Sequence, residues 1–162
     1  MRPTEPLPLH HSWPLFDLRA HLSTAALDPD AAEHEEALAE RGLGLWRCDL
    51  ADNRLSWSVG VYDLFGLERG SPVDRCQAAA LYTPDSRDAM ERLRAYAIGH
   101  KRGFTLDVDI DRADGGRCAM RLVAAPVLDA QGDVIALHGA KQLLPRDAAP
   151  SRGLAPAIFV ML

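Results

Sequence analysis

The most constraining feature of this sequence is a strict alternation of apolar and polar residues over residues 104–111. Apolar side chains stand at positions 104, 106, 108 and 110, and a threonine and three aspartates fill the alternate positions. Because successive side chains of a β-strand point to opposite faces, this pattern predicts a strand with one buried face and one hydrated face. The chain must therefore build a sheet that is covered on one side.

Two further strands follow this one at turn-length spacing. Residues 114–116 read Asp-Gly-Gly, which favours a tight hairpin, and apolar residues alternate again over 118–124. A second turn at Gln131 and Gly132 precedes the apolar segment 134–137. Residues 104–139 are therefore predicted to form a three-stranded meander.

Upstream of the meander, the pattern predicts a hairpin and helices. Residues 43–57 read as two short strands around an Asp-Asn turn, and apolar residues surround Gly66 in a short helical piece. A longer helix is predicted to begin at Asp85, directly after a proline, and to end at Gly99. This order of strands and helices is typical of an α+β fold.

Composition excludes several classes of function. The chain has 162 residues, of which 48% are hydrophobic and 25% charged, as expected for one folded domain with extensions. Its 18 basic and 23 acidic residues give a net charge of −5, which argues against nucleic-acid or anionic-lipid partners. No apolar run approaches the roughly 20 residues of a membrane span, and the first residues lack a signal-peptide core, so a cytoplasmic protein is expected.

The ends of the chain are predicted to differ from its centre. Four prolines in the first 14 residues predict an extended lead over 1–27 without sheet, although residues 15–22 have the apolar spacing of a short helix. A flanking helix is predicted over 28–41, and Gly42 is placed to cap its end in the left-handed conformation. Residues 42–144 form the predicted domain, and 145–162 an irregular tail.

The predicted flanking helix carries one apolar stripe, formed by Leu27, Ala31, His34 and Leu38. The 4-3-4 spacing of these residues is that of a coiled-coil seam, which indicates a dimer or partner interface. Packing of the same stripe on the domain's own sheet explains it equally well.

The order of short motifs resembles a known family. They stand at residues 42–46, 49–50, 57–58, 62–67, 84–87, 114–116, 126–127, 129, 132, 134, 137, 139 and 142. Together they cover about 100 of the 162 residues and resemble a PAS domain of the fold-3 subtype. Thr83 and Ala119 depart from this pattern, because the family usually has a histidine and a tryptophan at these positions.

The resemblance implies a five-stranded antiparallel sheet with short helices and one long helix on one face, enclosing a small cavity. Such domains sense ligands, redox state or light, or bind partners, and commonly dimerise through a helix before the first strand. Inward apolar residues are then the cavity candidates, with ordinary core packing as the alternative role for each. These candidates are Trp46, Tyr62, Phe65, Met90, Leu93, Phe104, Leu106, Cys118 and Met120.

Cofactor and metal chemistry find little support in the residues. A haem ligand would have to be His100, whose position at a helix end favours a solvated role, and the cysteine motif of flavin photochemistry is absent. Haem and flavin are therefore not expected, and the ligand stays unknown. His10, His11 and His21 are predicted to be solvated, and no metal site is expected.

No catalytic motif stands in the sequence either. There is no nucleophile elbow, phosphate-binding loop or zinc-protease helix, and the inward strand positions are expected to offer no buried ionisable pair. A non-catalytic, bacterial regulatory protein of signal transduction is therefore predicted, acting as a homodimer on a protein partner such as a sensor histidine kinase of a two-component system. A ligand-free scaffold and a sensory fragment of a larger histidine kinase remain the alternatives.

Overall fold

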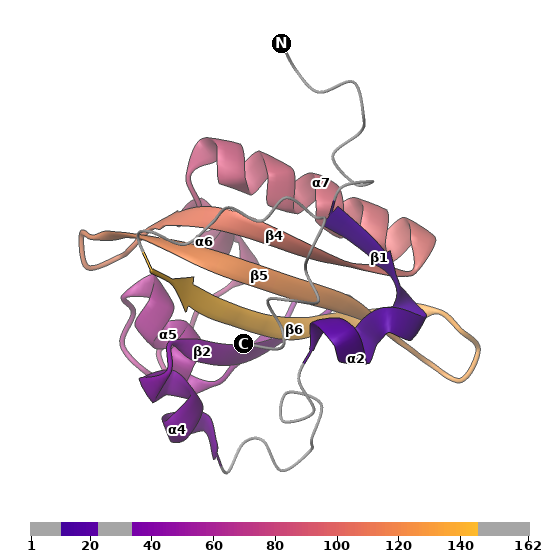
Figure 1. Cartoon of the computed structure of the whole chain (residues 1–162), viewed down its shortest axis with the longest axis horizontal. Helices are drawn as coiled ribbons and strands as arrows, with labels where there is room; N and C mark the ends of the chain where they lie inside the picture. Colours follow the sequence, from indigo (N-terminus) through magenta and orange to yellow (C-terminus); the bar gives the residue numbers. More distant parts are fainter. Residues whose placement is uncertain (1–10, 23–33, 146–162) are drawn as a thin grey trace.

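The predicted meander forms the centre of the structure. The computed structural model describes residues 11–22 and 34–145. Strands β4 (Arg102–Asp111), β5 (Arg117–Leu128) and β6 (Val134–Leu144) pair antiparallel in sequence order. They lie side by side across the middle of the molecule (Figure 1). The α+β class expected from the sequence is confirmed.

Within the described residues, the sheet has one strand more than expected. The predicted hairpin is present as β2 (Leu43–Asp49) and β3 (Leu55–Trp57), with β2 beside β6. The sixth strand, β1 (Ser12–Pro14), pairs with β4, so the order is β1-β4-β5-β6-β2-β3. The prediction of no sheet in the proline-rich lead was wrong here, because an edge strand tolerates a residue that lacks a donor N–H.

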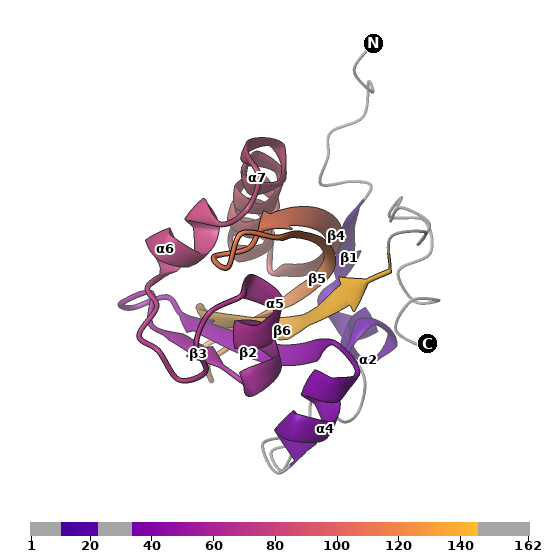
Figure 2. The same cartoon turned by 90° about the vertical axis from the view of Figure 1, so that its left-hand side faces the viewer.

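Three helices lie on one face of the sheet: α5 (Val59–Phe65), α6 (Arg75–Ala80) and α7 (Pro84–His100) (Figure 2). Helix α6 begins with a capping box. The side chain of Asp74 accepts a hydrogen bond from the backbone N–H of Gln77, and the side chain of Gln77 accepts one from the backbone N–H of Asp74. Helix α7 extends one residue past its predicted end, and Lys101 closes it with a φ of 56°.

The flanking helix is described only in its second half. Helix α4 (Glu35–Glu40) packs beside α5 and β2, and Gly42 follows it with a φ of 73°, the left-handed conformation expected there. Leu27 and Ala31, two of the four stripe residues, lie outside the described residues.

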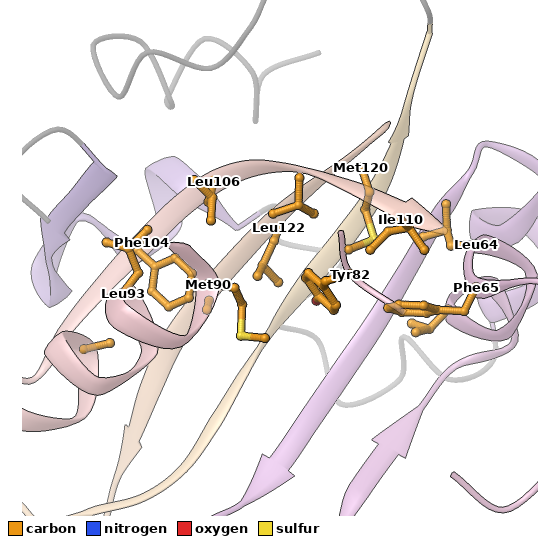
Figure 3. Packing of buried hydrophobic residues seen from close by; sticks show 14 residues of the cluster. Leu64, Phe65, Tyr82, Met90, Leu93, Phe104, Leu106, Ile110, Met120 and Leu122 are labelled. Atoms are coloured by element: carbon orange, nitrogen blue, oxygen red, sulfur yellow. The ribbon is translucent and has the colours of Figure 1, made fainter. Parts of the chain in front are cut away.

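The main core lies between the helices and the sheet. Phe104, Leu106 and Ile110 are buried on the inner face of β4, as the alternation predicted, and pack with side chains such as Met90 and Leu93 of α7 (Figure 3). Each apolar side chain of this size contributes about 1.5–3 kcal/mol when it is fully buried.

The opposite face is also partly covered, which the sequence analysis did not foresee. The 3-10 helix η1 (Leu15–Asp17) and helix α2 (Leu18–His21) form a small second layer there, with Leu22 buried at its end. Trp13 lies against Gly103, where an added Cβ would meet the indole ring at 2.2 Å. Its Nε1 donates to Thr105 Oγ1 at 3.1 Å, so Thr105 is fully buried instead of hydrated.

Candidate functional site

A cavity lies between the inner face of the sheet and helices α6 and α7. Its volume is about 60 Å³. Figure 3 shows Phe104, Met90, Tyr82 and Leu122 directed into this part of the interior. The lining residues are Trp46, Cys48, Leu55, Trp57, Arg75, Ala78, Ala79, Tyr82, Met90, Arg94, Phe104, Leu122, Leu137 and Lys141.

The central polar group of the cavity is the ammonium of Lys141. This residue stands on β6 opposite Leu122 of β5 and Gly44 of β2, and side chains that oppose each other across a ladder share a face. Lys141 therefore points toward the core, and only 6% of it is exposed. Its Nζ donates to the hydroxyl oxygen of Tyr82 at 3.0 Å.

Four aromatic rings surround this amine. The distances from Nζ to the ring centroids are 4.8 Å for Phe65, 5.4 Å for Trp46, 5.5 Å for Tyr82 and 5.8 Å for Trp57. Trp57 stacks on Phe65, with centroids 5.0 Å apart. The negative faces of aromatic rings attract a cation, so this arrangement offsets part of the cost of burying the charge.

Among the residues that the structure describes, no carboxylate lines the cavity to compensate the lysine. Burial lowers the pKa of Lys141 to about 7, and the nearby thiol of Cys48 opposes this shift. Burial also raises the pKa of Tyr82, so its hydroxyl keeps its proton near neutral pH. The amine of Lys141 is therefore about half neutral at pH 7.

The remaining polar groups of the lining are donors, apart from the thiol. Arg75 of α6 donates to Glu91 of α7, which joins the two helices. Arg94 of α7 donates to the Oδ1 of Asn53 at 3.3 Å and has no carboxylate partner among the described residues. The buried Nε1 of Trp46 has no hydrogen-bond partner in the described part of the chain. This set of donors is complementary to an anion that accepts hydrogen bonds.

The structure divides the nine predicted cavity residues into two groups. Trp46, Met90 and Phe104 line the cavity, and the ring of Phe65 faces the ammonium of Lys141. The other five belong to the packed core around it: Leu93, Leu106 and Met120 are buried, Tyr62 packs edge-on against Trp57, and Cys118 donates to the Leu64 carbonyl at 3.6 Å.

The sequence analysis missed the polar part of the site. The expectation that inward strand positions hold no buried ionisable pair was wrong, because Lys141 and Tyr82 form one. The signal was available in the alternation of β6, where Leu137, Gly139 and Lys141 share a parity. The predicted meander stopped at Gly139, two residues too early to include the lysine.

The histidines singled out in the sequence lie away from the cavity. His21 was expected to be solvated, but it is buried and stacks on Trp13 with centroids 3.9 Å apart, and burial lowers its pKa to about 4. The Nδ1 of His11 lies 3.0 Å from the Thr105 carbonyl, and His10 is outside the described residues. His100 is exposed and stacks on Tyr96.

Two further observations bear on the predicted metal and interface residues. Within residues 11–22 and 34–145, no group of three or more His, Cys, Asp or Glu side chains could hold a metal ion. On the flanking helix, His34 is exposed and Leu38 half-buried, while α4 as a whole contacts its own domain. The interface therefore stays a prediction.

Comparison with solved structures identifies the fold. An RNA-binding light-oxygen-voltage receptor matches with a TM-score of 0.57 and 17% identity, over 66% of this chain and 31% of the receptor. The N-terminal domain of a diguanylate cyclase with a PAS/PAC sensor from Marinobacter aquaeolei matches with a TM-score of 0.56 and 19% identity, over 61% and 92%. The chain has the PAS fold.

A third PAS-fold neighbour is the blue-light activated histidine kinase of Erythrobacter litoralis, with a TM-score of 0.56 and 23% identity, over 71% of this chain and 37% of the kinase. These neighbours do not distinguish the fold-3 subtype, which stays a prediction. No protein-family model and no curated protein matches the sequence. Among the described residues, no helix is long and apolar enough to cross a membrane.

The size of the cavity limits what this PAS domain can hold. Sites for cofactors and drug-sized ligands measure roughly 300–1,000 Å³. The cavity of about 60 Å³ is several times smaller, so the residues present do not fit a flavin or a haem. At roughly 10–15 Å³ for each water-sized group, it holds about four to six non-hydrogen atoms.

Proposed function

We propose that this chain is a non-catalytic sensory PAS module that binds a small organic anion in the cavity above Lys141. The observation that carries this proposal is the lining itself, in which buried or half-buried cations and donors face a small space, with no carboxylate from the described part of the chain. An anion in this space would accept hydrogen bonds from Lys141 and Trp46.

The ligand class follows from size and charge. A carboxylic acid of about four to six non-hydrogen atoms fills the available volume and supplies the missing negative charge. Arg94, which donates to Asn53 and has no carboxylate partner among the described residues, offers its guanidinium to the ligand's carboxylate.

We further propose that binding changes the joint between α6 and α7. Arg75 lines the cavity and also holds the two helices together through Glu91. A ligand shifts a conformational equilibrium only if it prefers one state, and competition for Arg75 provides such a preference. The change would be transmitted to a protein partner such as a sensor histidine kinase. This part of the proposal is supported by structural neighbours that come from a histidine kinase and from a diguanylate cyclase with a PAS/PAC sensor.

Ligand binding is tested with the purified full chain. Native mass spectrometry would detect a co-purified ligand, and calorimetric titration with propionate would measure binding directly. We expect binding to the wild type and to Lys101→Met, whose lysine is exposed, and loss of at least about tenfold in affinity for Lys141→Met. A clean apo mass together with no heat from any of several small carboxylates would contradict sensing and favour a ligand-free scaffold.

We also propose that the protein is a cytoplasmic homodimer that associates through the flanking-helix stripe. Sedimentation of Leu38→Glu and of the matched control Ala37→Glu, an exposed site on the same helix, tests this role. A dimer lost only in Leu38→Glu supports it. A wild type that sediments as a monomer, or a Leu38→Glu variant that stays dimeric, would make the stripe intramolecular.

A further inference from the structure

We propose that Lys141 binds its ligand covalently, as an imine formed with the carbonyl group of a small 2-oxo acid. This inference rests on the proposed function, because it uses the same cavity and the same anionic ligand. It adds a chemical bond and narrows the ligand class.

The position of the amine supports this assignment. Lys141 lines the cavity and is only 6% exposed, and the only side-chain hydrogen bond of its Nζ within the described residues is to Tyr82. A lysine held charged by a carboxylate has no lone pair for attack on a carbonyl, but no carboxylate of residues 11–22 or 34–145 lines this cavity. The other lysine of the chain, Lys101, is exposed and closes α7.

The rest of the lining suits the two functional groups of a 2-oxo acid. Arg94 is a guanidinium without a carboxylate partner among the described residues, and it lines the same cavity as Lys141. The ligand's carboxylate would pair with this guanidinium, and its carbonyl would face the amine. A 2-oxo acid of five or six non-hydrogen atoms, such as glyoxylate or pyruvate, matches the volume of about 60 Å³.

The bond-forming step balances with groups that line the cavity. The lone pair of Nζ attacks the carbonyl carbon, and a proton moves from nitrogen to the carbonyl oxygen to give a carbinolamine. The C–O bond then breaks as a water molecule leaves, and a C=N bond remains. The Tyr82 hydroxyl lies 3.0 Å from Nζ and keeps its proton near neutral pH, so it can protonate the departing hydroxyl and recover a proton from the nitrogen.

Several charged or titratable groups surround the amine and set its reactivity. Cys48 faces it from β2 and Tyr82 from the segment before α7, while Arg75 and Arg94 line the cavity from α6 and α7. Glu91 is bound to Arg75. Burial disfavours the charged form of the lysine, and a neutral amine is the form that reacts.

The experiment is reductive trapping of the full-length protein. Wild-type chain is incubated with pyruvate and cyanoborohydride at pH 7, and peptide mapping then locates any mass increase equal to pyruvate less one oxygen atom. We expect Lys141 to be modified at least about tenfold more than Lys101, because an ordinary exposed lysine is almost entirely protonated at this pH. This comparison lies within one molecule and requires no variant to fold.

Two controls assign the effect to the site. Lys141→Arg keeps a cation and should lose the adduct, and Tyr82→Phe should slow trapping at Lys141 while leaving Lys101 unchanged. Equal modification of both lysines, or no adduct on Lys141, would overturn the imine. Lactate lacks the ketone of pyruvate and cannot form an imine. If lactate still binds while no imine forms with pyruvate, the imine proposal is wrong and the proposed anion binding stands.

Discussion

Replacement of Lys141 by methionine should abolish a specific pH dependence of stability. In the folded chain, burial lowers the pKa of this lysine from 10.5 to about 7. The unfolded chain therefore binds more protons than the folded chain between about pH 7 and pH 10, and stability rises with pH in this window. From pH 7 to pH 9 the expected gain in the free energy of unfolding is about 2 kcal/mol, because one bound proton is worth about 1.4 kcal/mol for each pH unit and the folded lysine is still about half protonated at pH 7.

Urea unfolding of the wild type and of Lys141→Met at pH 7 and pH 9 measures this difference. Methionine has a similar length and no charge, but it leaves the Tyr82 hydroxyl unpaired, at a cost of about 1–3 kcal/mol. That cost acts at both pH values and cancels in the pH difference. Burial raises the pKa of Cys118 and of Tyr82, and their titration is common to both proteins.

The matched control is Lys101→Met, which should keep the wild-type gain because Lys101 is exposed. The reasoning is refuted if Lys141→Met gains as much stability as the wild type between pH 7 and pH 9. Such a result would mean that the lysine stays fully charged in the folded chain, and the neutral amine required for imine formation would then be absent.

Three further outcomes test the fold. Leu106→Arg should unfold the domain because it buries an unpaired charge. Asp109→Arg, on the exposed side of the same strand, should melt at a temperature close to that of the wild type. Thermal unfolding compares the two variants. Trp13→Ala should cost about 3–5 kcal/mol in urea unfolding, because it removes the ring that covers Thr105, and a loss below 1 kcal/mol would show that the outer layer is dispensable. Acid should also weaken this layer, because burial lowers the pKa of His21 to about 4 in the folded chain. The free energy of unfolding should therefore fall as the pH falls from about 6.5 toward 4. Thermal unfolding of His21→Phe should show a smaller loss of stability over the same pH range.

The central sheet and the long helix could be predicted because their patterns are local and repeated. The alternation over residues 104–111 fixes which face of β4 is buried, and the proline and aspartate before Met90 mark the start of α7. Strand β1 could not be predicted in this way. It is three residues long, contains Pro14, and exists only because β4 offers an open edge.

The site was less accessible to sequence reasoning, for a different physical reason. A single lysine in an apolar strand usually marks a hydrated position, and only the pairing of Lys141 with Leu122 shows that it faces inward. Which apolar residues line the cavity also depends on where α6 and α7 rest on the sheet. Leu93 and Phe104 are both buried inward residues, yet only Phe104 lines the cavity.

Strand β1 also determines how the sheet can meet other chains. A peptide that adds to a sheet needs unpaired backbone groups along an outer strand. In the described part of the chain, β1 pairs with β4 only along Arg102–Phe104, and the other border is β3, a strand of three residues. Removal of residues 11–14 would therefore expose the backbone of Arg102–Phe104 and lengthen the edge of β4 at which a strand of another copy could pair.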